Sequence, residues 1–221
     1  MNQAAIKQLG TLSLINFASK HAEKLNQFPD ESLRAHGARV LGETDKLRNA
    51  YAARRPLRAL WVDATRAKDD KDDALDDLVR TVSYDLLAPA LLNKNRKAPE
   101  YRVLFPDGTI AFIDGSDREE IAHVHGMVAY LRATPTHPMA GRAEALHEKV
   151  VALEEALGPQ ARAEQALRAA EVLEREARDG LHRCLRKSVT FLRDHFDGTE
   201  SKVDSLFPSI AEAKVKEEEP E

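Results

Sequence analysis

Residues 143–157 read AEALHEKVVALEEAL, and this stretch does most to decide the fold. Its apolar positions are separated by three, four, three and four residues, which is the spacing of one face of an α-helix. These positions are Ala143, Leu146, Val150, Leu153 and Leu157. We therefore expect a helix whose apolar seam packs against other helices.

The composition favours the same fold class along the whole chain. Of its 221 residues, 32% are charged and only 5% are aromatic, which is typical of long helices packed side by side. A chain of this length can form one large domain or two domains of about 100 residues each. We therefore expect a mainly α protein with a sizeable core.

Prolines and turn residues divide the chain into six predicted helices. Pro56 and Pro159 are each expected in the first turn of a helix, where a missing N–H costs nothing. Asp30 or Ser32 is expected to cap the second helix, and Ser116 or Asp117 to begin the fourth. The predicted helices are 3–27, 30–55, 56–92, 116–133, 143–157 and 159–195.

A short β-hairpin is expected between the third and fourth helices. Residues 102–105 and 109–113 have the apolar, β-branched and aromatic character of strands. They flank Pro106-Asp107-Gly108, which suits a tight turn. We predict that this hairpin connects two helical units.

The two units resemble each other. The helical stretch opened by Pro56 is followed by Leu104-Phe105-Pro106, and the stretch opened by Pro159 is followed by Leu206-Phe207-Pro208, about 103 residues later. We predict an up-and-down helical bundle built from two tandem copies of a roughly 103-residue three-helix unit. The predicted divisions are a first unit at 1–100, the hairpin connector at 101–115, a second unit at 116–210 and a disordered acidic tail at 211–221.

Charge, cysteine content and hydropathy exclude several classes of protein. A net charge of -4 and a pI near 6.1 argue against a general nucleic-acid binder, which usually carries a basic excess. The single cysteine, Cys184, is expected to pack as a small apolar residue on a helix. The apolar run at residues 12–18 is too short and too polar to cross a membrane. We expect a soluble, cytoplasmic protein that binds neither nucleic acid nor a membrane.

Two Glu-x-x-His pairs are the strongest candidates for a metal site. Glu120 with His123, and Glu144 with His147, lie on consecutive predicted helices, and residues three apart share a helix face. Two such pairs in a bundle core, with further carboxylates, form a di-iron site. Each pair lies at the edge of its apolar seam, however, so we interpret all four side chains as solvated.

An acidic run at residues 69–73 and a basic cluster near Arg54 are the other charged features. The run contains a DDxxD spacing that resembles the magnesium–diphosphate motif of all-helical isoprenyl-diphosphate enzymes, but a second facing acidic cluster is missing. We interpret it as a helix cap or a solvated face. The run and the tail glutamates also suggest, more weakly, an acidic mimic of nucleic acid. Arg54, Arg55 and Arg58 are expected to form local ion pairs.

No catalytic motif is recognisable, so the sequence assigns no catalytic, cofactor-binding or metal residue. The apolar seams are expected to be used in helix packing, which leaves no polar pocket. The leading hypothesis is a non-enzymatic scaffold, adaptor or assembly subunit that binds a protein partner or forms a homo-oligomer, without a cofactor. The alternative is a di-iron-like metal-binding bundle using Glu120, His123, Glu144 and His147.

Overall fold

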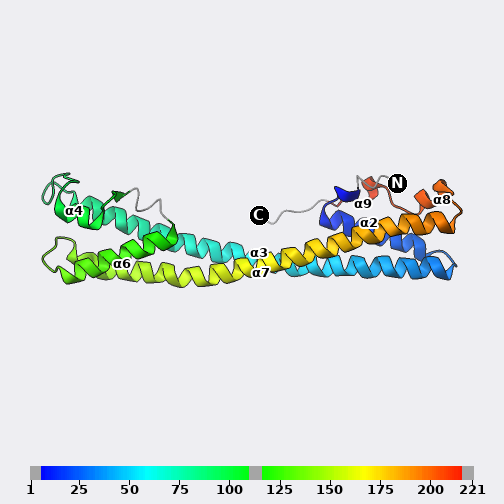
Figure 1. Cartoon of the computed structure of the whole chain (residues 1–221), viewed down its shortest axis with the longest axis horizontal. Coiled ribbons are helices and arrows are strands. Elements are labelled where there is room, and N and C mark those ends of the chain that lie inside the picture. The colour runs from blue at the N-terminus through cyan, green and yellow to red at the C-terminus, as the bar shows by residue number, and fades with distance from the viewer. Residues whose placement is uncertain (1–5, 110–115, 216–221) are drawn as a thin grey trace. The chain divides into compact units, whose positions relative to one another are not determined.

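The computed structural model describes residues 6–109 and 116–215, and these residues are mainly helical (Figure 1). The predicted mainly α class is therefore confirmed. No helix in these two ranges is both long and apolar enough to cross a membrane. The elements are α2 (Thr11–Asn26), α3 (Glu31–Leu86), α4 (Pro99–Leu104), α6 (Asp117–Ala133), the 3-10 helix η1 (Ala140–Arg142), α7 (Ala143–His195), α8 (Glu200–Ser205) and α9 (Ile210–Ala213).

Pro56 and Pro159 do not begin helices, contrary to the sequence prediction. Pro56 lies inside the continuous α3, and Pro159 lies inside the continuous α7. A proline inside a helix costs about 3 kcal/mol, because it removes one hydrogen bond and its ring crowds an earlier carbonyl. Both rings are exposed, so neither disturbs packed side chains. Buried apolar positions on both sides of each proline offset this local cost.

The predicted β-hairpin is also wrong. Its first strand, residues 102–105, falls largely within α4, and no strand occurs among the residues that the structure describes. Tyr101 and Leu104 are both buried, and their separation of three residues is a helical period rather than the alternation of a strand. The expected turn is present, since Gly108 has a φ of 88°. Most of the second strand, at 110–113, lies outside the described residues.

The chain packs as two compact units that differ from the predicted tandem division. Unit 1 combines residues 1–59 with 165–221, and unit 2 comprises residues 60–164. Each of the long helices α3 and α7 therefore contributes to both units, which a division into 1–100 and 116–210 does not allow. The order of a helix, a long helix and a short helix occurs twice, as α2–α3–α4 and as α6–α7–α8. The duplication itself stays a prediction.

The core of unit 1 lies between α2, the first part of α3 and the last part of α7 (Figure 1). On α2, the face predicted from the sequence is buried, including Leu14, Ala18 and Leu25. Along α3 and α7, His36 contacts Ser188 and Arg54 contacts Glu174. The residue numbers rise on one helix as they fall on the other, so these two segments are antiparallel.

The core of unit 2 lies between the last part of α3, α4, α6 and the first part of α7. Four of the five seam positions that predicted α7 are buried, namely Ala143, Leu146, Val150 and Leu153. On α3 the helical period is a less accurate guide. It places Leu60 on one apolar face with Ala64 and Ala67, but Leu60 is 57% exposed, whereas Leu75 and Val79 are fully buried.

Both predicted helix starts are present as capped N-termini. Asp30 accepts hydrogen bonds from the backbone N–H groups of Ser32 and Leu33, at 2.8 and 3.1 Å, at the start of α3. Ser116 and Glu119 form a reciprocal capping box at the start of α6. These side chains satisfy backbone donors that have no partner within the helix.

Part of the predicted tail, residues 211–221, is ordered. Ala213 belongs to α9 and is fully buried, because α9 packs against α2. The Ser13 hydroxyl also accepts a hydrogen bond from the backbone N–H of Val215 at 3.0 Å. The rest of the tail, residues 216–221, lies outside the described residues.

Candidate functional site

The residues of the predicted metal site contact different neighbours. Glu144 is exposed, and its carboxylate accepts two hydrogen bonds from Arg132, at 3.0 and 2.9 Å. The ring of His147 lies 6.4 Å from the ring of His125, and His123 is exposed. Within the described ranges, no three His, Cys, Asp or Glu side chains are grouped as metal ligands would be. The alternative di-iron hypothesis therefore gains no support from these contacts, and the interpretation of all four side chains as solvated is wrong for Glu120, which is buried.

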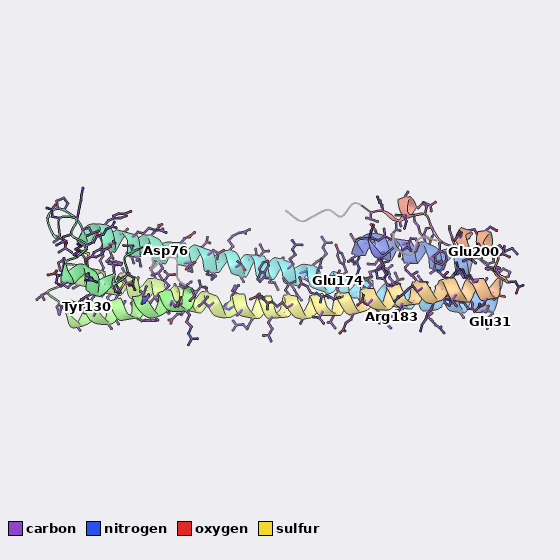
Figure 2. The ribbon with its side chains drawn as sticks, turned by 45° about the horizontal axis from the view of Figure 1, so that its top comes forward. Glu31, Asp76, Tyr130, Glu174, Arg183 and Glu200 are labelled. Atoms are coloured by element: carbon purple, nitrogen blue, oxygen red, sulfur yellow. The ribbon has the colours of Figure 1, made fainter. Side chains whose placement is uncertain are left out.

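Glu120 is the member of that set with an unusual environment. It is only 3% exposed, and its Oε1 atom has no hydrogen-bond partner. Burial, and then the negative charges of Asp76 and Asp72, raise the pKa of Glu120 to about 8. Asp76 lies on α3 (Figure 2) and accepts a hydrogen bond from the protonated Glu120 carboxyl. A pKa of about 8 favours the protonated form of Glu120 at neutral pH.

Lys68 balances the charge at the edge of this carboxyl cluster. Its ammonium group donates to Asp72 at 3.2 Å and to Asp117 at 3.1 Å. Burial by itself would lower the pKa of Lys68, but the hydrogen bonds to the two carboxylates outweigh burial and raise it. These contacts join α3 to the start of α6, so the cluster has a structural role.

The acidic run at residues 69–73 does not cap a helix, because it lies inside α3. Its members Asp69, Asp70 and Asp73 are exposed, as expected for a solvated face. The alternative interpretation of the run as a helix cap is therefore wrong.

Two buried histidines in unit 1 are held by structural partners. His21 is fully buried and donates from Nδ1 to the carbonyl oxygen of Leu206 at 2.9 Å, while its ring stacks on Phe207. Burial lowers the pKa of His21 to about 4, so the ring is neutral at pH 7. His36 is hydrogen-bonded to the hydroxyl of Ser188 at 2.7 Å. Both rings therefore serve helix packing.

In the basic cluster near Arg54, the expected local ion pair is formed by Arg54 itself. Arg54 lies 3.1 Å from Glu174, which is labelled on α7 in Figure 2. Glu174 is only 6% exposed, and it also accepts a hydrogen bond from Thr11 at 2.8 Å. This contact fixes α2 to the two long helices within unit 1.

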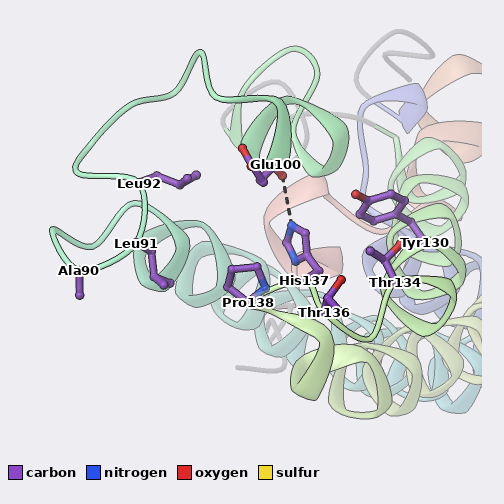
Figure 3. Close-up of a pocket in the computed structure, with 9 residues that line it drawn as sticks. All are labelled: Ala90, Leu91, Leu92, Glu100, Tyr130, Thr134, Thr136, His137 and Pro138. Atoms are coloured by element: carbon purple, nitrogen blue, oxygen red, sulfur yellow. Dashed lines mark hydrogen bonds between the residues drawn. The ribbon is translucent and has the colours of Figure 1, made fainter.

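An open pocket of about 370 Å³ lies in unit 2, between the segment after α3, the start of α4 and the segment after α6 (Figure 3). His137 donates from Nε2 to the carbonyl oxygen of Glu100, at a long distance of 3.4 Å. Its Nδ1 accepts from the backbone N–H of Met139 at 3.2 Å, so both ring nitrogens are engaged. Tyr130 packs edge-on against the His137 ring. Leu91, which is 45% exposed, adds apolar surface.

A second pocket, of about 520 Å³, lies in unit 1 and corrects the expectation that no polar pocket would be left. Its lining consists of Lys7, Arg178, Asp179, His182, Arg183 and Arg186. Basic side chains dominate this lining, and such a lining is suited to binding an anion.

Comparison of the chain with protein-family models, with curated proteins and with solved structures gives no match.

The sequence analysis missed both pockets, for different reasons. The pocket of Figure 3 joins residues 90–92 to residues 130–138, and nothing in the sequence predicts that these segments meet. The basic pocket does have a sequence signal, since no Asp or Glu occurs between Asp179 and Asp194. On a helix, residues four apart share a face, so this stretch predicts a basic face on α7.

Proposed function

We propose that the chain is a non-enzymatic helical-bundle protein, acting as a scaffold, adaptor or assembly subunit that binds a partner protein. The observation that supports this proposal best is the pocket of Figure 3, in which Leu91 and Tyr130 present apolar surface beside an open cavity. Tyrosine is enriched among the residues that dominate binding energy at protein interfaces.

The chemistry of the pocket lining favours binding over reaction. His137 uses both ring nitrogens in contacts with the backbone, which leaves it no lone pair for a substrate proton. A volume of about 370 Å³ lies near the small end of the range of ligand sites, and one or two apolar side chains of a partner would fill it. We expect the occupant to be an apolar side chain on a helix or loop of another protein.

Unit 2 also carries other exposed apolar side chains. Tyr84 on α3 is 71% exposed, and Val103 on α4 is 51% exposed.

The test is affinity capture with the full chain, comparing the wild type with Leu91→Asp and with Val172→Asp. Val172 lies in unit 1 and is 49% exposed, so it matches Leu91 in exposure and in the change of chemistry. We expect a protein that the wild type and Val172→Asp both capture, but that Leu91→Asp fails to retain. Sedimentation velocity of the same three proteins over a range of concentrations tests whether the partner is a second copy of the chain. In that case, the wild type and Val172→Asp should self-associate, and Leu91→Asp should not.

Equal capture by all three proteins would refute the role of this pocket. A monomer that captures nothing, or a measured catalytic turnover, would refute the proposed function as a whole. Circular dichroism spectra of each variant provide the control for folding.

A further inference from the structure

The basic pocket in unit 1 has a charge distribution that the proposed protein-binding function does not use. Four permanently charged cations surround one carboxylate and one histidine. The chain as a whole has a net charge of -4, so this concentration of positive charge is local. The cations are Lys7, Arg178, Arg183 and Arg186, with Asp179 and His182 completing the lining.

The helical period of α7 creates the pocket. Arg178, His182 and Arg186 are four residues apart and form one row along the helix, and Arg183 (labelled in Figure 2) lies in the next row. Lys7 comes from the segment before α2 and completes the pocket from a second part of the chain. Two segments that are distant in the sequence thus direct cations into one cavity.

Part of the pocket is held in place before any ligand binds. The guanidinium of Arg178 donates to the hydroxyl of Thr11 at 3.3 Å and to the carbonyl oxygen of Leu9. These contacts involve neutral oxygens, so the positive charge of Arg178 is not neutralised by them. A side chain fixed in this way loses little freedom when an anion binds.

The other cations keep their charge available. Within residues 6–109 and 116–215, no carboxylate forms an ion pair with Lys7, Arg183 or Arg186. Burial, and then the charges of Arg178, Arg186 and Lys7, lower the pKa of His182, whereas Asp179 opposes this effect. The field inside the pocket is therefore positive, and an anion would relieve the mutual repulsion of these groups.

We propose that this pocket binds the phosphate groups of a small phosphorylated molecule. Guanidinium groups form paired, charge-assisted hydrogen bonds with phosphate oxygens, and the pocket contains three of them. Its volume of about 520 Å³ lies in the range of small-molecule sites. A nucleic-acid backbone is a poorer candidate, because proteins that bind it usually carry a basic excess over the whole domain, whereas this chain has a net charge of -4.

Isothermal titration calorimetry with inorganic tripolyphosphate tests this proposal on the full chain. The variants are Arg183→Glu and Arg186→Glu, and the matched control is Lys187→Glu, which makes the same charge change on an exposed residue of α7 outside the pocket. Each pocket variant is expected to bind at least about tenfold more weakly, since one charge-assisted contact contributes about 1.5 to 3 kcal/mol. The control is expected to stay within about twofold of the wild type.

Two results would overturn the proposal. One is the absence of binding by the wild type at millimolar tripolyphosphate, and the other is an equal loss of affinity in Lys187→Glu, which would show unspecific attraction to α7. Circular dichroism melting of all four proteins ensures that a loss of binding is not a loss of folding.

A second measurement separates the two sources of the phosphate group. The chain is sedimented with vesicles of phosphatidylcholine that contain phosphatidic acid. Co-sedimentation that is lost in Arg183→Glu identifies a lipid headgroup as the ligand, while a chain that binds tripolyphosphate but stays in the supernatant identifies a soluble molecule.

Discussion

The substitution Glu120→Gln is expected to stabilise the protein at alkaline pH. Glu120 is 3% exposed and its pKa rises from 4.5 to about 8 in the folded chain, because of burial and then the charges of Asp76 and Asp72. In the unfolded chain, Glu120 releases its proton near pH 4.5. Between these two pH values the folded state binds more protons than the unfolded state, so stability falls as the pH rises.

The magnitude follows from the difference in pKa. A difference of about 3.5 pKa units corresponds to an upper limit of about 4 to 5 kcal/mol above pH 8. The neighbouring Asp76 also has a raised pKa, so the cost is divided between the two carboxyl groups and we expect about 2 to 4 kcal/mol in practice. Glutamine has the shape of the protonated acid and can still donate a hydrogen bond to Asp76. It should therefore remove this cost above pH 8 and change little below pH 4.5.

Urea unfolding followed by circular dichroism at pH 5, 7 and 9 measures this difference. The advantage of Glu120→Gln should increase from pH 5 to pH 9. Glu119→Gln is the matched control with the opposite sign, since hydrogen bonds from the backbone N–H and hydroxyl of Ser116 lower the pKa of Glu119. This control should be less stable than the wild type at pH 7 and 9. If Glu120→Gln gives no advantage at pH 9, Glu120 ionises without cost and the burial argument fails.

Four further substitutions test the packing of the helices. Gly37→Ala should destabilise by about 1 to 2 kcal/mol, because its Cβ would lie 3.2 Å from both the carbonyl oxygen of Ala22 and the Cβ of Leu25, which cannot move aside as the Asn26 side chain can. In contrast, the Cβ of Gly42→Ala meets nothing within 4 Å, so this substitution should stabilise by about 0.5 to 1 kcal/mol. Urea unfolding compares the two variants. Pro56→Ala should raise the melting temperature and add about 1 to 3 kcal/mol if α3 is continuous, and no gain would mean that a helix begins there. Because the folded chain holds the pKa of His21 at about 4, the protein loses stability as the pH falls from 6.5 to 4. His21→Leu should remove about 2 to 3 kcal/mol of that pH dependence. An unchanged acid unfolding transition would contradict this expectation.

The helical period of apolar residues identified most of the buried positions, but not which helix face is buried along the whole length of α3. Leu33, Val40 and Leu47 are buried on α3, as their spacing predicts. The prediction fails farther along α3, where Leu60 is 57% exposed. A helix has a period near 3.6 residues, so the face that is buried shifts when the neighbouring helices change along its length. Which neighbours those are is not encoded locally.

Gly37 and Pro56 show how tertiary packing overrides a local preference. Gly37 contributes little burial by itself, yet it allows α3 to approach Asn26, Ala22 and Leu25 closely. Pro56 suits the first turn of a helix and is also tolerated on the exposed side of a continuous helix. The local preference of a proline for the first turn of a helix decides where a helix begins only if the residues on either side of it pack weakly.

The candidate sites show the same division between local and distant information. Glu120 was recognised by its spacing from His123, but its neighbours Asp72 and Asp76 come from α3 rather than from the other predicted metal ligands. The pKa of Glu120 depends on that tertiary neighbourhood, so no spacing rule could have predicted it.

The sequence by itself determined that this protein is mainly helical, where α3 and α6 begin, and which face of α7 is apolar at residues 143–153. These properties depend on neighbours within one or two turns. Only the tertiary structure decided that α3 and α7 continue through their prolines and serve both units. It alone brought Lys7 to the arginines of α7 and Leu91 to Tyr130. Those contacts join residues far apart along the chain, and they arise from the packing of whole helices rather than from any local preference.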